Sequence, residues 1–145
     1  MQTNSKLSLH SLPQKYTVIA QMLTIAWLSS IVFLSLLAPD KNPVKPPFPH
    51  FDKLAHFIIY AGLEFSSLVS EHLRRSRKLN AKETAALTTI VLSIGGAIEF
   101  LQMTVGRNAE WMDMLANASG VFLALVLIGL IRKWFIADGM HHTLK

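Results

Sequence analysis

The sequence contains no cysteine and little charge. Without cysteine the chain cannot form disulfides, a thiolate metal site or a cysteine nucleophile. Only 16% of its 145 residues are Asp, Glu, Lys or Arg, whereas 51% are hydrophobic, and the mean hydropathy is +0.37. A water-soluble domain of this size would need a more highly charged surface. The composition therefore favours an integral membrane protein.

Long apolar stretches supply the expected membrane spans, at about residues 16–38, 53–70, 84–105 and 111–132, and the first of them has no charged residue. About 20 apolar residues cross the ~30 Å hydrocarbon layer as a helix. The first stretch exceeds the roughly 7–15 apolar residues of a signal peptide, and no A-x-A cleavage site follows it. A soluble helical protein is the alternative, but the first and fourth stretches have almost no polar face. We therefore predict an all-α fold, an integral membrane bundle of four transmembrane helices in a single domain over residues 16–135.

The segments outside this domain are polar. Residues 1–15 and 136–145 are predicted cytoplasmic segments, and residues 39–50, which hold five of the six prolines, are predicted to form an extended, polyproline-like loop.

The basic residues predict the orientation. Four spans place both termini and the 71–83 loop on one side, which then holds ten of the 14 lysines and arginines; the other four are Lys41, Lys45, Lys53 and Arg107. Because cytoplasmic loops are enriched in Lys and Arg, the prediction is N-in/C-in. The basic cluster at 74–78 is then explained by topology and anionic lipid head groups. No aromatic or base-reading element accompanies the cluster, so we predict no nucleic-acid partner.

The second apolar stretch carries an unexpected polar stripe. Asp52, His56, Tyr60 and Glu64 recur every four residues and so share one helix face. A carboxylate facing lipid would cost at least ~2.5–3.5 kcal/mol, so we expect this face to point into the bundle. Asp52 could instead be the N-cap of the helix. Glu64 lies roughly 18 Å along the helix from Asp52, and we leave its role open.

Other polar residues are expected at the same depth, on the outer side of the membrane. They are Glu99, Gln102, Arg107, Asp113 and Asn117. Ala116, Gly120 and Ala124 repeat every four residues on the side of the fourth span that carries Asp113 and Asn117, a pattern that lets helices approach closely. The pattern predicts an outward-opening polar pocket between the second, third and fourth spans, with the first span as a mostly apolar support.

We predict that this pocket binds a ligand rather than catalysing a reaction. Lys53 and Arg107 would hold a phosphate or carboxylate, and amide and imidazole groups would orient it. The predicted ligand-binding residues are Asp52, Lys53, His56, Tyr60, Glu99, Gln102, Arg107, Asp113 and Asn117. The sequence defines no oligomeric state.

Two other functions stay open. In an intramembrane enzyme acting on a lipid head group, the candidates for acid–base catalysis would be His56, Glu99, Asp113 and Asp52, with Arg107 stabilising an oxyanion. No serine–histidine pair or glycine-rich phosphate loop supports this alternative. The same four residues contain one histidine among carboxylates, which is a poor zinc set, so we assign no metal and no cofactor. The remaining alternative is a purely structural polar network.

Four short motifs contain most of these polar residues: "DKLAHFIIY" at 52–60, "EFLQ" at 99–102, "GR" at 106–107 and "DMLANASG" at 113–120. Together, in this order and spacing, they resemble the VanZ-like family of small bacterial membrane proteins. By this resemblance Asp52, Lys53, His56 and Tyr60 take the first motif's positions, Glu99 and Gln102 the second's, and Arg107, Asp113, Asn117 and Gly120 the third's. Glu110 stands where we expect a small or hydroxyl residue in many relatives, which implies a more acidic pocket rim here.

The resemblance implies a multi-pass protein of the bacterial cytoplasmic (inner) membrane. The family takes its name from a protein linked to resistance to the glycopeptide teicoplanin, so the resemblance implies a cell-envelope ligand. A lipid-linked cell-wall precursor and a lipoglycopeptide antibiotic such as teicoplanin are the candidates, with the lipid bilayer as the surrounding partner. Most members have no established activity, so the resemblance implies the fold and the site more firmly than the function.

Overall fold

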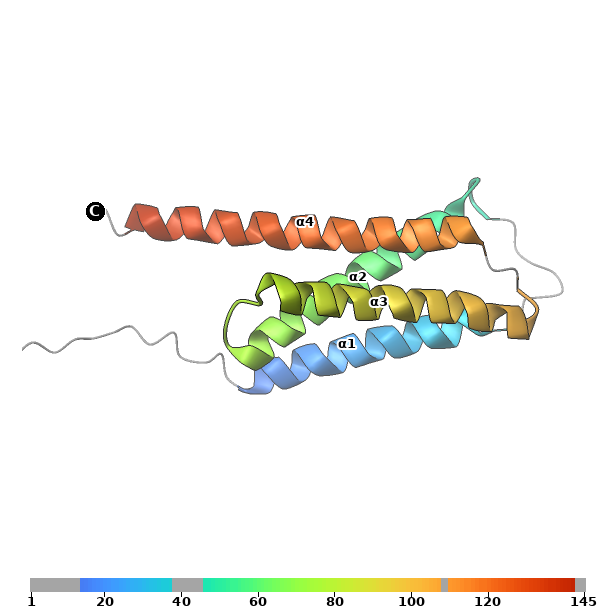
Figure 1. Ribbon diagram of the computed structural model, residues 1–145, viewed down its shortest axis with the longest axis horizontal. Coiled ribbons are helices and arrows are strands. Elements are labelled where there is room, and N and C mark those ends of the chain that lie inside the picture. The colour runs from blue at the N-terminus through green and yellow to red at the C-terminus, as the bar shows by residue number, and fades with distance from the viewer. Residues whose placement is uncertain (1–13, 38–45, 108–109, 143–145) are drawn as a thin grey trace, which may run out of the picture.

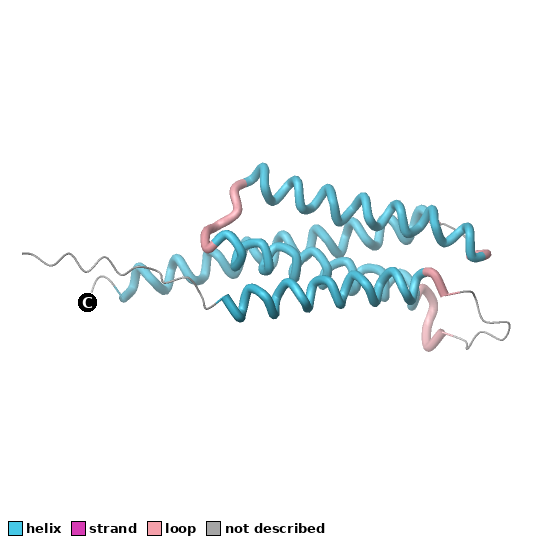
Figure 2. The backbone as a smooth tube through the Cα atoms, turned by 90° about the horizontal axis from the view of Figure 1, so that it is seen from below, coloured by secondary structure: helices cyan, strands magenta, loops and turns pink. Residues whose placement is uncertain are grey.

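The protein is an antiparallel helical bundle. The computed structural model describes residues 14–37, 46–107 and 110–142, with side chains up to Lys133. Within these ranges the helices are α1 (Gln14–Ser35), α2 (Phe51–Arg75), α3 (Ala81–Gln102) and α4 (Trp111–His142), with a 3₁₀ turn η1 (Met103–Val105) after α3 and no strand. Successive helices run in opposite directions (Figures 1 and 2). Both α2 and α3 contact every other helix, whereas no contact between α1 and α4 occurs in the described part of the chain.

Three of these helices are long and apolar enough to cross a membrane. They are α1, α3 together with η1, and α4 up to Lys133. The 25 residues of α2 would span roughly 38 Å, but its composition does not qualify it as a span. His56, Tyr60, Glu64 and the serines that follow lower its hydropathy. The prediction of an all-α membrane protein is confirmed, while the second span is not established by composition.

The helix ends differ in places from the apolar stretches. α2 continues to Arg75, past the expected end at residue 70, because Glu71 pairs with Arg74 and Arg75 along its last turns. α4 continues to His142, into the segment expected to be a tail. Most of the expected N-terminal segment (1–13), part of the proline loop (38–45) and residues 143–145 lie outside the described residues.

The first turns of α2 and α3 are capped differently. Asn80 and Glu83 form a capping box at the start of α3, in which each side chain accepts a hydrogen bond from the other's backbone N–H at 2.9 Å. The N-cap of α2 is His50, in the left-handed conformation with φ 61°. The interpretation of Asp52 as an N-cap is therefore wrong. Its carboxylate lies in the first helical turn, where the helix dipole favours an anion.

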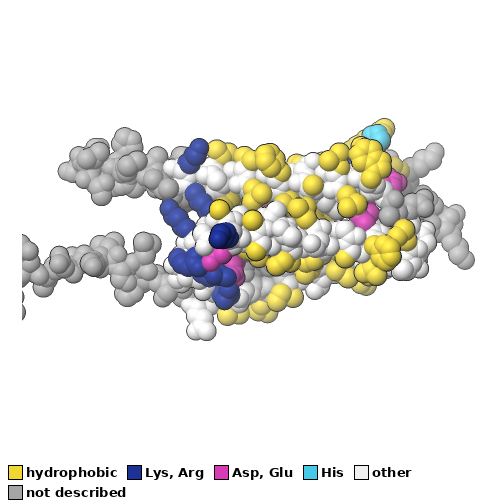
Figure 3. Space-filling model, viewed as in Figure 1, with side chains coloured by type: hydrophobic (Ala, Val, Ile, Leu, Met, Phe, Trp, Pro, Cys, Tyr) yellow, Lys and Arg dark blue, Asp and Glu magenta, His cyan; other side chains and the backbone are white. Residues whose placement is uncertain are grey.

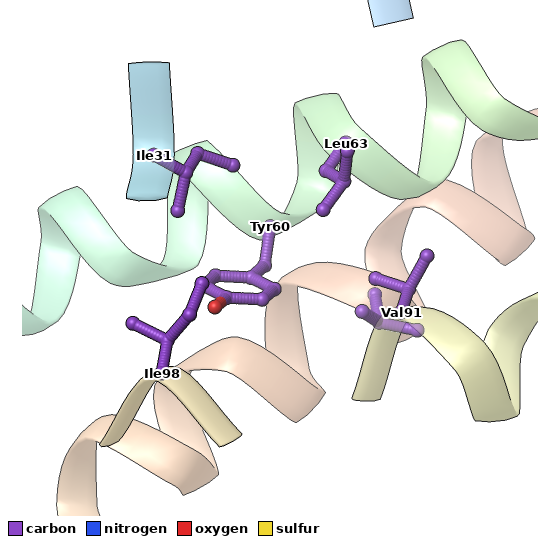
Figure 4. Packing of buried hydrophobic residues seen from close by; sticks show 6 residues of the cluster. Ile31, Tyr60, Leu63, Val91 and Ile98 are labelled. Atoms are coloured by element: carbon purple, nitrogen blue, oxygen red, sulfur yellow. The ribbon is translucent and has the colours of Figure 1, made fainter. Parts of the chain in front are cut away.

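Tyr60 lies at the centre of the apolar core. Its ring packs among Ile31 of α1, Leu63 of α2, and Val91 and Ile98 of α3 (Figure 4). Gly95 of α3 makes room for this ring, because a Cβ at that position would lie 3.0 Å from Tyr60 Cε1. Burial of these side chains holds α1 and α3 against α2.

The outer surface of the bundle is apolar. Ile31 is the one buried residue of α1, and large side chains such as Met22, Phe33 and Phe122 are more than 60% exposed. Figure 3 shows yellow apolar side chains over the middle of the bundle, with Lys and Arg gathered at one end and acidic side chains at both ends. Apolar patches of this extent are typical of a surface that faces lipid.

The basic end is held by ion pairs across the turn between α2 and α3. A hydrogen bond from Arg74, together with pairing to Arg75, lowers the pKa of Glu71 to about 2. A hydrogen bond from Arg77 and one from the Asn80 backbone lower the pKa of Glu83 to about 2. The arginines of this turn are therefore partly neutralised by acidic neighbours.

Candidate functional site: a charge cluster and an adjoining cavity

Lys53 joins the start of α2 to the start of α4. Its Nζ lies 2.7 Å from Asp52 Oδ2 and 2.6 Å from Asp113 Oδ1, and it also pairs with Glu110 Oε2. The Lys53 side chain is only 16% exposed and that of Asp113 only 10%. One ammonium therefore holds three carboxylates, and its pairing with Asp113 is the least hydrated of the three contacts.

His56 lies one helical turn deeper and faces α3 and α4 together. Its Nδ1 lies 3.0 Å from Asn117 Oδ1 and 3.6 Å from Glu99 Oε1. Its Nε2 lies 3.9 Å from Asp113 Oδ2. We call His56, Glu99, Asp113 and Asn117 the inner cluster. Helical spacing places Asp113 and Asn117 on the same face of α4, and the end of α3 brings Glu99 to the same depth.

Glu99 is buried without the hydrogen bonds that a buried carboxylate needs. Its side chain is 4% exposed, and neither carboxylate oxygen has a hydrogen-bond partner among the described residues. The buried Nδ2 of Asn117 also has no hydrogen-bond partner among the described residues. Buried polar groups are normally satisfied, so the inner cluster has capacity for a further polar contact.

Gln102 and Arg107 point away from the inner cluster, toward α1. Gln102 Nε2 and Arg107 Nη1 both donate to the carbonyl oxygen of Ser35, at 3.3 and 3.4 Å. The chain reverses after α3 through η1 and Gly106, whose φ of 81° is in the left-handed region. The predicted site residues therefore come together as two groups on opposite sides of α2, and not as one.

A cavity of about 540 Å³ opens on the α1 side. Its polar lining includes Asp52, His56, Gln102 and Arg107, and its apolar lining includes Trp27, Ile31, Leu34 and Ile59. Tyr60 also reaches it, and the Tyr60 hydroxyl has no hydrogen-bond partner among the described residues.

The cavity differs in position from the pocket that the sequence predicts. The expected pocket lay between the second, third and fourth helices, with the first as a support, whereas α1 forms a wall of the observed cavity. The physical reason is the close contact of α2 and α4, where a Cβ on Gly120 would lie 2.1 Å from the Phe57 carbonyl oxygen. Helices this close pack tightly against each other, and the polar groups between them form a cluster.

Sequence reasoning missed the contacts of Trp27. Its indole Nε1–H donates to the Ile59 carbonyl at 3.0 Å, and its ring lies against Gly62, where a Cβ would approach within 2.6 Å. A tryptophan in one apolar stretch and a glycine in the next gave a weak signal for this pairing. The contact fixes one wall of the cavity.

Glu64 belongs to neither group. It is fully buried, and Thr88 Oγ1 donates to its Oε1 at 2.6 Å, from α3. This hydrogen bond joins α2 and α3 separately from the inner cluster. Glu64 therefore has a partner on another helix and lies apart from the candidate site.

The fold and the buried polar cluster define a class: a small helical membrane protein whose central helices carry ionisable side chains inward. A protein-family model described as VanZ/LLP1 matches residues 2–132, and the chain belongs to that family. The resemblance inferred from the sequence motifs is thereby confirmed. No curated protein and no solved structure matches the chain significantly.

Proposed function

We propose that this protein binds an amphiphilic cell-envelope ligand with an anionic head group, in the cavity between α1, α2 and the end of α3. The protein would act as a binding component of the bacterial cytoplasmic membrane, with both termini inside the cell. A lipid-linked cell-wall precursor or a lipoglycopeptide such as teicoplanin has the required combination of acyl or isoprenoid chain and polar group.

The amphipathic lining of the cavity carries this proposal. Trp27, Ile31 and Ile59 offer an apolar wall next to the lipid-facing surface of α1. At the other end, Arg107 is exposed, and among the described residues its side chain makes one long hydrogen bond, to a backbone carbonyl. A guanidinium in this position can form paired hydrogen bonds with a phosphate or carboxylate. A ligand with a tail and an anionic head would satisfy both ends together.

The distribution of charge supports the proposed orientation. Arg74, Arg75, Arg77 and Lys78 lie at the end of the bundle where α2 ends and α3 begins, and Figure 3 shows this end rich in Lys and Arg. By the positive-inside rule this end would face the cytoplasm. The cavity and Lys53 would then lie near the outer surface.

The proposed topology includes α2 as the fourth crossing. Its polar side chains are turned inward, since Tyr60 and Glu64 are buried while Ile58 is 54% exposed. An inward polar stripe removes the main cost of placing this helix in lipid. Its length is also sufficient for a crossing.

Single cysteines would test the orientation, because the natural sequence has none. In intact cells a membrane-impermeant maleimide should label Phe48→Cys, and it should label Lys78→Cys only after the cells are opened. Both residues are exposed in the structure. The reverse labelling pattern would contradict the proposed topology.

Ligand binding is tested by mass spectrometry of lipids that copurify with the full-length protein, and by direct titration with teicoplanin. Ala55 lines the cavity, so Ala55→Leu should reduce occupancy by steric filling, and Arg107→Gln should weaken capture at least tenfold. Ala118→Leu, on the exposed face of α4, is the matched control. Equal capture by all of these proteins would contradict a role for the cavity.

Recovery of a chemically altered ligand would instead favour the enzymatic alternative. A protein that is destabilised by substitutions in the inner cluster, but captures nothing in its natural form, would favour the purely structural network.

A further inference from the structure

Three helices bring potential metal ligands together in the inner cluster. His56 of α2, Glu99 of α3 and Asp113 of α4 each offer one ligand atom, and these atoms all lie within 4.8 Å of one another. Atoms that share one metal ion lie roughly 3–4.5 Å apart, because each is about 2.0–2.2 Å from the ion. The separations in the cluster, including 3.6 Å from His56 Nδ1 to Glu99 Oε1, are close to that range.

Glu99 gives an independent indication of a ligand. Both its carboxylate oxygens are buried and lack a hydrogen-bond partner among the described residues, and Oε1 faces the His56 ring. An unpartnered carboxylate in a low-dielectric interior carries a large desolvation penalty. A bound cation would remove that penalty directly.

The excess of negative charge around the inner cluster also favours a bound cation. Asp52, Glu110 and Asp113 share a single ammonium, that of Lys53, and Glu99 adds a fourth carboxylate on the other side of Asp113. Arg107 lies too far toward α1 to compensate, since it donates to the Ser35 carbonyl. With its carboxylates ionised, this region has more negative than positive groups, which favours a divalent cation.

Asp113 separates the ammonium from the proposed cation. Its Oδ1 pairs with Lys53 at 2.6 Å, while Oδ2 faces His56. The other acidic group, Asp52 with Glu110 and Asp113, also brings ligand atoms together, but Lys53 Nζ already pairs with all three residues. The cluster that includes His56 and Glu99 is therefore the one with free carboxylate oxygens.

We propose that His56, Glu99 and Asp113 bind one divalent transition-metal cation, with Asn117 Oδ1 as an additional oxygen ligand. One imidazole nitrogen among carboxylate and amide oxygens suits Mn²⁺ better than Zn²⁺, which prefers more nitrogen or sulfur. The observed 3.0 Å between His56 Nδ1 and Asn117 Oδ1 is the separation expected for two ligands at right angles about 2.1 Å from an ion. This site does not depend on the proposed ligand of the cavity.

The test is titration of the purified, full-length protein with Mn²⁺ after treatment with a chelator. Loss of the electron paramagnetic resonance signal of free Mn²⁺ should show one saturable site per chain, and Mg²⁺ should compete weakly. Glu99→Gln keeps the shape of the side chain and should weaken Mn²⁺ binding at least tenfold. Glu64→Gln is the matched control, since Glu64 is an equally buried glutamate outside the cluster, and it should leave the affinity unchanged.

Three further variants locate the site and guard against misfolding. Glu110→Gln alters only the group around Lys53 and should retain Mn²⁺ binding. Asp113→Asn and His56→Gln should each abolish Mn²⁺ binding. Circular dichroism identifies any of the three cluster variants, including Glu99→Gln, that has lost helicity. That variant is then set aside, and the other two decide. The absence of saturable binding by the natural protein, or equal binding by the helical cluster variants, would overturn the proposal. Loss of lipid capture would not bear on it.

Discussion

Gly120 of α4 lies directly against the backbone of Phe57 in α2. A Cβ at Gly120 would be 2.1 Å from the Phe57 carbonyl oxygen and 2.9 Å from the Ala61 backbone nitrogen. Both obstacles are backbone atoms, so a side-chain rotation cannot relieve the clash. This contact brings the inner cluster together, because it sets the distance between the helices that carry His56 and Asn117.

Gly120→Ala should therefore destabilise the protein although alanine favours helices. We expect a loss of about 1–3 kcal/mol or more from overpacking, measured as a lower unfolding temperature in detergent. Gly129→Ala is the control on the same helix, because nothing lies within 4 Å of a Cβ there. That variant should be neutral or up to about 1 kcal/mol more stable. Equal behaviour of the two variants would show that the helices are farther apart than described.

Lys53→Met should destabilise the end of the bundle where α2 and α4 begin. The substitution leaves the largely buried Asp113 carboxylate without its cation, whereas Asp52 and Glu110 remain accessible to water. Breaking a fully buried pair costs about 3–5 kcal/mol, and exposed pairs contribute about 0–1 kcal/mol. We expect an intermediate loss, of about 1–3 kcal/mol, in chemical unfolding.

A double-mutant cycle identifies the partner of Lys53. Combining Lys53→Met with Asp113→Asn should cost less than the sum of the two single substitutions, because each removes the same interaction. Combination with Glu71→Gln, at the opposite end of α2, should be additive. Additivity in both cases would contradict the Lys53–Asp113 pairing.

The end of the bundle at the α2–α3 turn should lose stability in acid. The pKa of Glu83 is lowered from 4.5 to about 2 by Arg77 and the Asn80 backbone. A lowered pKa means that the carboxylate stabilises the folded state fully above about pH 4.5, and that this contribution disappears as the pH falls toward 2. Gln at position 83 can still form the capping box, so Glu83→Gln isolates the charge.

Thermal unfolding at several pH values checks this expectation. The natural protein should unfold at a higher temperature than Glu83→Gln at pH 7, and the difference should shrink steadily below about pH 4.5. Lys78→Gln, in the same turn, should show no such trend over the acidic range. A difference that stayed constant down to pH 2 would contradict the Glu83–Arg77 pairing.

Thr88→Val should destabilise the middle of the bundle. The substitution preserves the side-chain shape but removes the hydroxyl that donates to Glu64. Leaving a buried acceptor unsatisfied costs about 1–3 kcal/mol, which chemical unfolding can measure. Thr89→Val is the matched control, since the Thr89 hydroxyl is exposed and bonds only to its own helix. The Glu64→Gln, Thr88→Val double variant should recover part of the loss.

The sequence was sufficient to predict the helices and the polar residues that meet. Long apolar stretches predicted α1, α3 and α4, and the four-residue spacing of Asp113 and Asn117 predicted their common face. His56 can contact α4 or α1 according to how closely α2 approaches each of these helices. Gly120 sets the distance between α2 and α4, and Trp27 sets the distance between α1 and α2. Single-helix periodicity contains no information on those distances, so the cavity was expected on the wrong side of α2.

The cap of α2 and the hydrogen-bond partners of Gln102 and Arg107 could not be predicted from the sequence pattern either. Asp52 had the residue type of an N-cap, but the left-handed backbone at His50 starts the helix earlier. Gln102 and Arg107 belonged to motifs shared with the inner cluster, yet Gln102 at the end of α3 and Arg107 after the turn at Gly106 both donate to the Ser35 carbonyl. Such outcomes depend on backbone dihedrals at one or two residues.

The His56 ring has one consequence for how the two sides of α2 communicate. The same imidazole borders the cavity and forms the inner cluster, and both of its ring nitrogens face the inner cluster. A ligand in the cavity that pushed on the ring would shift these contacts. Binding of the proposed ligand on the α1 side and of the proposed cation on the α4 side would therefore be thermodynamically linked through a single side chain, and such linkage acts equally in both directions.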